Sequence, residues 1–129
     1  MGRPRILVID DEQVLRETIA DSLRMDGFDV QAAADGKEGL ELIGRTPFDV
    51  ILSDLRMPEM DGRALYDEVR RDHPQALKRF VFVTAQAHGP EYGPFLRETG
   101  APVLDKPFTL QQLRHIVEQM VGRGRHALR

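Results

Sequence analysis

The sequence contains no cysteine among its 129 residues. This absence excludes disulfide frameworks, thiolate metal sites and a cysteine nucleophile, and it is neutral as to compartment. Long hydrophobic runs are absent too: the mean hydropathy is -0.38, with 41% hydrophobic and 30% charged residues. Such a chain is too polar for a membrane span and too apolar for a disordered segment. Its length is typical of one globular domain.

An excess of positive charge is also missing, because 18 Lys and Arg residues stand against 21 Asp and Glu, a formal net charge of -3. The chain therefore has no excess positive charge with which to bind the phosphate backbone of a nucleic acid, and we expect no nucleic-acid contact by this segment. Only four apolar residues separate the basic start from the acids at residues 10–12, which is too few for a secretory signal. We therefore expect a cytoplasmic domain without membrane contact.

Short apolar runs alternate with longer amphipathic stretches, which is the pattern of βα units on a parallel sheet. The runs that predict strands lie at residues 5–9, 28–33, 48–53, 80–83 and 102–104. Because the runs at residues 5–9 and 48–53 are almost wholly apolar, we expect these two strands to be buried on both faces. The sequence therefore predicts an α/β fold with a doubly wound, five-stranded parallel sheet.

Apolar residues at helical spacing predict a helix after each strand. Residues suited to begin or end a helix flank the first three: Gly27, Asp35 with Arg45, and Asp61 with His73-Pro74.

The fourth helix is expected to be short, irregular or mobile, because Gly and Pro recur through residues 89–94. The last is expected to begin near Thr109 and to end at Gly122. We accordingly assign the domain to residues 4–121 and interpret residues 122–129 as a C-terminal tail or linker remnant.

Polar residues follow the carboxyl ends of four predicted strands, at the edge where open parallel sheets bind ligands. They are Asp10, Asp11, Asp54, Thr84 and Lys106. Taken alone, the acids at residues 10–12 would more often be the acidic start of a helix. Three crowded carboxylates, however, repel one another unless a cation relieves them. Oxygen ligands without His or Cys favour a hard divalent ion such as Mg²⁺.

This arrangement suits phosphoryl transfer. An aspartate beside a divalent ion can attack phosphorus and form an acyl phosphate. The lysine and the metal would neutralise charge on the transferring group, and the threonine hydroxyl could donate a hydrogen bond to a phosphoryl oxygen.

Four segments, ILVIDDE at residues 6–12, LSDLRMPEMDG at 52–62, VTA at 83–85 and DKPF at 105–108, together resemble the receiver domain of two-component response regulators. They stand in the family's order and spacing over nearly the whole chain. The resemblance implies a flavodoxin-like (βα)5 fold and a phosphorelay function. The implied partner is a histidine kinase or a histidine phosphotransfer domain; a weak homodimer is also compatible with it.

The resemblance implies a role for each site residue. Asp54 is similar to the phosphoacceptor, which takes a phosphoryl group from phosphohistidine. Asp11 matches the direct Mg²⁺ ligand and Asp10 the acid that holds the ion through water. Asp54 and the backbone carbonyl of Arg56 complete the metal set.

Lys106 matches the lysine that contacts the phosphoryl group, and its bond to Pro107 is cis in this family. Thr84 matches the switch hydroxyl, with small Ala85 leaving room for the phosphoryl group.

The chain also departs from the family's pattern. Val103 stands where the switch aromatic is expected, which puts the usual coupled movement of threonine and ring in doubt. The Gly and Pro residues at 89–94 put the same output face in question. Arg56 and Gln86 lie where side chains bias hydrolysis of the acyl phosphate. Residues 97–104 are similar to C-terminal receivers of hybrid sensor histidine kinases, so the parent is either such a kinase or a single-domain regulator.

Three other function classes share some of these features. A phosphohydrolase with an aspartate nucleophile shares the sheet, Mg²⁺ and lysine, but Arg56 stands where its second acid would lie. A flavin carrier is disfavoured because the acids at residues 10–12 would repel its phosphate. A receiver-like interaction module that is never phosphorylated is disfavoured by the complete set of acids, threonine and lysine. We expect no turnover enzyme, only a domain that assists its own phosphorylation and dephosphorylation.

Overall fold

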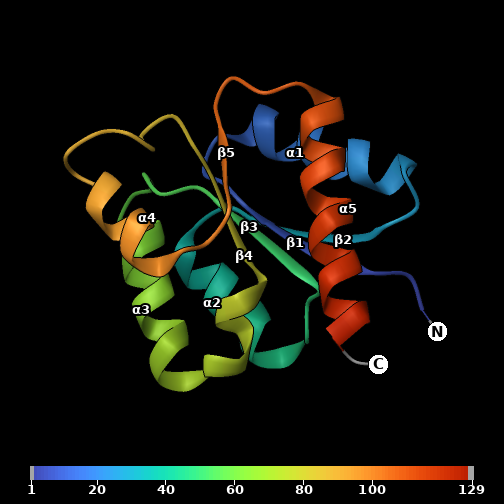
Figure 1. Ribbon diagram of the computed structural model, residues 1–129, viewed down its shortest axis with the longest axis horizontal. Helices are drawn as coiled ribbons and strands as arrows, with labels where there is room; N and C mark the ends of the chain where they lie inside the picture. Colours follow the sequence, from blue (N-terminus) through green and yellow to red (C-terminus); the bar gives the residue numbers. More distant parts are fainter. Residues whose placement is uncertain (1, 128–129) are drawn as a thin grey trace.

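The computed structural model describes residues 2–127 and contains one parallel sheet of five strands. They are β1 Arg5–Ile9, β2 Asp29–Ala33, β3 Val50–Ser53, β4 Phe80–Thr84 and β5 Val103–Asp105. Their spatial order is β2-β1-β3-β4-β5. The chain thus moves from β1 to one side of the sheet and then crosses to the other (Figure 1). The predicted doubly wound α/β fold is confirmed.

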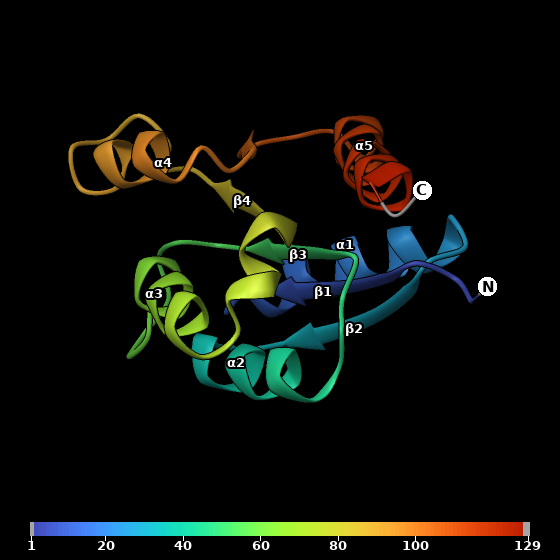
Figure 2. The ribbon, with the colours of Figure 1, turned by 60° about the horizontal axis from the view of Figure 1, so that its bottom comes forward.

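Five α-helices cover the two faces of the sheet. They are α1 Gln13–Met25, α2 Gly36–Arg45, α3 Gly62–Asp72, α4 Gly93–Thr99 and α5 Leu110–Ala127. Figure 2 shows α1 and α5 on one side of the strands and α2 and α3 on the other. No helix within residues 2–127 combines the length and the apolar character that crossing a membrane requires.

Side chains alternate along each strand and so enter two separate cores. Ile6 and Val8 of β1 pack in the core that α1 and α5 close, whereas Leu7 and Ile9 pack in the core that α2, α3 and α4 close. All four side chains are almost completely buried. Helices on both faces are the reason that β1, β3 and β4 read as nearly continuous apolar runs.

The predicted helix boundaries are confirmed at three positions. The Asp35 and Asp61 carboxylates accept hydrogen bonds of 2.8 Å from the backbone N–H groups of Glu38 and Ala64, capping α2 and α3. Gly27 follows α1 with a φ of 96°, a left-handed conformation that favours glycine. The fourth helix is short, as expected, with seven residues.

The expected end of the last helix at Gly122 is wrong, because α5 continues to Ala127. Glycine lowers helix propensity without forbidding helical backbone, and a buried Met120 beside it keeps this turn packed. A 3₁₀ helix, η1 Pro74–Arg79, was not predicted, and β3 begins at Val50 rather than residue 48. The division between a domain and a tail at residue 122 stays a prediction.

Candidate functional site

The carboxyl ends of β1 and β3 bring three acids together. The two strands are in register at Ile9 and Ser53, so Asp10 and Asp54 leave the sheet side by side. One carboxylate oxygen from each of Asp10, Asp11 and Asp54 lies within 4.8 Å of the others. Asp10 and Asp54 are 2% and 8% exposed, whereas Asp11 is exposed to solvent. The predicted convergence of these acids is confirmed.

The ammonium group of Lys106 bridges two of these acids. Its Nζ lies 3.0 Å from Asp10 Oδ2 and 3.0 Å from Asp54 Oδ2. Burial by itself would lower the pKa of Lys106, but the hydrogen bonds and charges of the two carboxylates together raise it. Lys106 is therefore a firmly charged cation. The peptide bond between Lys106 and Pro107 is cis, as the family resemblance implies.

The Asp54 carboxylate is held at both oxygens. Oδ1 accepts a 2.7 Å hydrogen bond from the backbone N–H of Leu55, while Oδ2 faces Lys106. Burial raises the pKa of Asp54 and the repulsion from Asp10 adds to this rise, although contacts with Lys106 and Leu55 oppose it. Its backbone N–H donates to Ile9 O at 3.0 Å, which anchors the residue to β1.

Asp10 is fixed by its own neighbours. Its Oδ1 accepts a 2.9 Å hydrogen bond from the backbone N–H of Glu12, and its backbone carbonyl accepts one of 2.9 Å from Arg16 Nη1. The first turn of α1 therefore orients this acid toward the site.

Thr84 ends β4 at the same edge and is completely buried. Its Oγ1 accepts a 3.0 Å hydrogen bond from the backbone N–H of Gln86, and its carbonyl accepts one of 2.9 Å from the backbone N–H of Lys106. Among the described side chains, neither Thr84 nor Arg56 is hydrogen-bonded to the acids. The hydroxyl proton of Thr84 thus remains free for another acceptor, as the predicted switch role requires.

Two contacts between the segment before α4 and the segment from β3 to α3 were not predicted. The Tyr92 hydroxyl donates a 2.9 Å hydrogen bond to Asp61 Oδ2, and the Arg56 guanidinium pairs with Glu91 at 2.7 Å. Burial, together with the hydrogen bond to Asp61, raises the pKa of Tyr92 to about 12. The partners are 31 and 35 residues apart in the sequence, so no short sequence pattern predicts these two contacts. An aromatic residue within a Gly- and Pro-rich segment is the one signal that the sequence contains.

The donor set fits a hard divalent cation. The cluster supplies carboxylate oxygens alone, and its three acids are accompanied by one ammonium group, which contacts two of them; a net negative charge is left for a cation to offset. Exposed Asp11 gives the cluster an open side, which suits an ion that keeps several water ligands.

An apolar pocket of about 520 Å³ adjoins the site. It lies between α1 and the start of α5, and Lys106 forms part of its wall. The other lining residues are mostly apolar: Leu15, Thr18, Ile19, Ala85, Pro107, Phe108 and Leu110. Val14 and Leu110 are 74% and 50% exposed, so apolar surface continues outward from the pocket.

Comparisons with known proteins agree with this geometry. A family model described as the response regulator receiver domain matches residues 6–118. The sensor kinase CckA of Brucella abortus is 34% identical over 93% of this chain, which spans 13% of that protein's length. The probable chemotaxis protein CheY of Rhizobium etli is 29% identical, with 92% of each chain covered.

A solved structure adds a similar fold with a metal. The receiver domain of the sensor histidine kinase PA1611 from Pseudomonas aeruginosa, which has a magnesium ion in its active site cleft, superposes with a TM-score of 0.83 at 28% identity. The alignment covers 95% of this chain and 99% of that one. The chain therefore belongs to the response regulator receiver domain family and is a receiver domain of two-component signalling.

Proposed function

We propose that Asp54 is the phosphoacceptor and takes a phosphoryl group from a phosphohistidine with the help of Mg²⁺. The observation that carries this proposal is the convergence of Asp54 with two further acids and the ammonium group of Lys106 at one edge of the sheet. Asp54 is buried beside a cation, so its carboxylate is oriented and little hydrated. These properties favour a carboxylate as a nucleophile toward phosphorus.

In this proposal an Asp54 oxygen attacks phosphorus, the bond from phosphorus to the histidine nitrogen breaks, and the imidazole keeps the bonding electron pair. Lys106 exchanges its contact with Asp54 Oδ2 for one with a phosphoryl oxygen. The Thr84 hydroxyl donates a hydrogen bond to another phosphoryl oxygen while its Oγ1 keeps the hydrogen bond from Gln86. Both contacts neutralise charge on the transferring group.

Asp10, Asp11 and Asp54, with the backbone carbonyl of Arg56, would hold Mg²⁺. Bound there, the ion supplies positive charge that offsets the phosphoryl oxygens and the crowded carboxylates. Asp11 is the exposed member of the set and makes no side-chain hydrogen bond to another described residue. It is therefore the ligand whose removal should disturb the fold least.

Phosphorylation is tested by incubating the chain with acetyl phosphate, with and without Mg²⁺, and measuring its intact mass. We expect a gain of one phosphoryl group with Mg²⁺ and none in EDTA. The variant Asp54→Asn, which keeps the size of the side chain, should show no gain. A gain that persists in Asp54→Asn, or no gain with any donor, would overturn the assignment.

Mg²⁺ is expected to raise the melting temperature, because it binds an acid cluster that exists in the folded state alone. At ten times its dissociation constant the ion stabilises by about 1.4 kcal/mol, roughly 3–6 °C for a domain of this size. Asp11→Asn should abolish most of this shift while the melting temperature in EDTA stays near that of the parent chain. An equal shift in both proteins, measured by calorimetry, would contradict the metal set.

The apolar pocket beside Lys106 is the docking surface for the phosphodonor in this proposal. A donor histidine must reach Asp54, and exposed apolar side chains next to the entrance are the part of this surface that a partner can bury. The partner class is a histidine kinase or a histidine phosphotransfer domain, with which receiver domains interact.

A charged residue introduced at position 110 distinguishes partner docking from the phosphoryl-transfer step itself. Leu110→Glu should slow transfer from a phosphorylated histidine kinase about tenfold or more, because a carboxylate would be buried in the interface. Phosphorylation by acetyl phosphate, which needs no protein interface, should keep its rate. The matched control is Met25→Glu, since Met25 is 89% exposed near the far end of α1. Equal slowing by both variants would argue against this surface.

The parent protein is proposed to be a hybrid sensor histidine kinase or a single-domain regulator, with the receiver at residues 4–121 and a cytoplasmic location. Similarity to both the sensor kinase CckA and the probable chemotaxis protein CheY supports these two layouts.

A further inference from the structure

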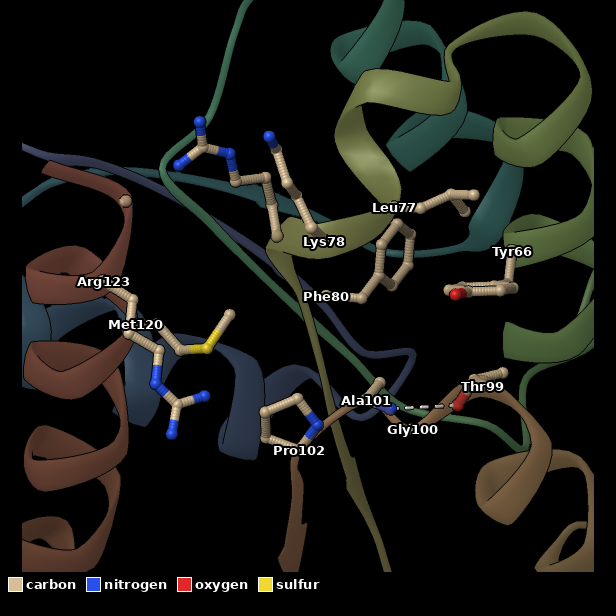
Figure 3. A pocket seen from close by; sticks show the side chains of 12 residues that line it. Tyr66, Leu77, Lys78, Phe80, Thr99, Gly100, Ala101, Pro102, Met120 and Arg123 are labelled. Atoms are coloured by element: carbon tan, nitrogen blue, oxygen red, sulfur yellow. Dashed lines mark hydrogen bonds between the residues drawn. The ribbon is translucent and has the colours of Figure 1, made fainter. Parts of the chain in front are cut away.

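A second pocket opens at the opposite edge of the sheet from the acids. Its volume is about 580 Å³, and it lies where β4 and β5 begin, between η1 and the last turns of α5 (Figure 3). Met120, Arg123 and Gly124 line it, and all three lie beyond residue 118, where the match to the receiver family ends. The continuation of α5 past Gly122 therefore builds one wall of this pocket.

The floor of the pocket is apolar and well packed. Phe80, Tyr66 and Met120 are 0%, 6% and 7% exposed and come from β4, α3 and α5. Tyr66 packs edge-on against Phe80, with ring centroids 5.2 Å apart, which makes this part of the floor rigid. Ala101 and Pro102, just before β5, close the side opposite Phe80 (Figure 3).

Three cations border this floor, and no acidic residue lines the pocket. They are Lys78, Arg79 and Arg123. Lys78 stands just before β4 with its ammonium end directed away from Phe80, and Arg123 lies beside Met120 and Pro102 (Figure 3). None of the three is joined by a hydrogen bond or an ion pair to a described residue, whereas six other arginines of the chain are paired with acids. The rim thus carries uncompensated positive charge.

Tyr66 adds a polar group inside the pocket. Its hydroxyl makes no hydrogen bond with any residue in the described part of the chain, although the side chain is more than nine-tenths buried. No fully buried side-chain nitrogen or oxygen there lacks a partner, so this hydroxyl must reach solvent. Figure 3 shows its oxygen directed toward the space between Phe80 and Gly100. The pocket therefore supplies a hydrogen-bond donor to whatever occupies it.

We propose that this pocket binds a small organic anion, with its aromatic or aliphatic body on the Phe80 and Met120 floor and its carboxylate or phosphate at the cationic rim. The volume lies within the range of small-molecule sites, which combine a mostly apolar lining with a few convergent polar groups. The cations of the rim attract an anion, and Tyr66 can donate a hydrogen bond to it from inside the pocket, whereas a cationic ligand would be repelled. The site is separate from Asp54, which lies at the other end of the strands.

The test uses naphthoate, neutral naphthamide of the same shape, and inorganic phosphate as probes in amide NMR titrations of the full chain. Naphthoate should shift resonances of η1, the start of β4 and residues 120–124. Naphthamide should bind about tenfold more weakly because it lacks the charge, and phosphate alone should bind more weakly still because it lacks the apolar body. No shift by naphthoate, shifts outside these segments, or equal binding by any two probes would overturn the proposal.

Substitutions distinguish the contribution of the cationic rim to binding from that of the apolar floor. Arg79→Gln with Arg123→Gln should weaken naphthoate binding about tenfold, whereas Lys37→Gln, which removes a cation in the first turn of α2 at the other end of the strands, should leave it unchanged. Ala101→Phe fills the pocket without altering charge and should abolish binding. Tyr66→Phe should weaken naphthoate binding several-fold while the melting temperature stays unchanged or rises. If the hydroxyl had only a structural role, its removal would leave naphthoate binding unchanged. Naphthoate affinity that survives Ala101→Phe, or both arginine changes in a folded protein, would refute the site.

Discussion

Replacing Lys106 with methionine is expected to slow phosphorylation of the chain at least 100-fold while strengthening Mg²⁺ binding. The ammonium group lies 3.0 Å from both Asp10 and Asp54 and, in the proposed transfer, contacts the incoming phosphoryl group. Removing one such charge-stabilising donor typically costs about 100- to 1,000-fold in rate. The same charge repels a divalent ion at the cluster, by an amount on the order of 1–2 kcal/mol, so Mg²⁺ should bind roughly tenfold more tightly.

This variant has a second consequence for stability. Without the ammonium group, two buried carboxylates face each other unpaired, and breaking a buried pair typically destabilises by about 3–5 kcal/mol. Lys106→Met should therefore melt well below the parent chain in EDTA, and Mg²⁺ should recover much of the difference. The control is Arg71→Met, which removes an exposed ion pair with Glu68. Titration calorimetry that shows weaker Mg²⁺ binding by Lys106→Met would contradict the bridging role.

Gly62→Ala is expected to destabilise the fold by about 2 kcal/mol or more and to reduce phosphorylation together with it. A Cβ at this position would overlap the backbone carbonyl of Asp54 and would lie 2.9 Å from the Cα of Leu55. Gly62 also donates a 2.8 Å hydrogen bond to the Leu55 carbonyl, so the loop cannot simply move away. Relief of the overlap must displace the backbone that carries Asp54, the proposed phosphoacceptor.

Gly122→Ala is the matched control for this prediction. A Cβ at Gly122 meets no atom within 4 Å, and the residue lies within α5. Alanine should therefore stabilise the chain by about 0.5–1 kcal/mol through helix propensity. Denaturant unfolding of both variants gives the two free energies. Equal effects of the two substitutions would show that close approach at Gly62 does not position Asp54.

Local patterns allowed most of the fold to be predicted. The continuous apolar runs of β1 and β4 indicate strands covered on both faces, and Asp35 and Asp61 indicate helix starts because a carboxylate there satisfies a free N–H group. The prediction that α5 ends at Gly122 was wrong because one glycine destabilises a helix by only about 1 kcal/mol. Burial of Met120 and Val117 stabilises this part of α5 by more than that. Helix η1 was missed because Pro74, which ends α3, equally begins a new short helix.

The acids of the candidate site could also be predicted, since parallel strands bring their carboxyl ends to one edge whatever the loops do. The residues at those ends are therefore neighbours by topology alone. The contacts of Tyr92 with Asp61 and of Arg56 with Glu91 could not be predicted in this way, because loop conformation decides which side chains meet.

The sequence by itself determined the sheet, its acid edge and membership of the receiver family, because strand pattern, strand ends and motifs are local. Tertiary structure alone decided that Lys106 bridges Asp10 and Asp54, across separations of 96 and 52 residues, and that no acceptor within the described residues takes the Thr84 hydroxyl proton. It also decided that α5 extends past Gly122 and gathers Lys78, Arg79 and Arg123 around an apolar floor. The charge and burial of these side chains depend on which elements, distant in the sequence, pack together. That packing is decided by the hydrophobic core as a whole.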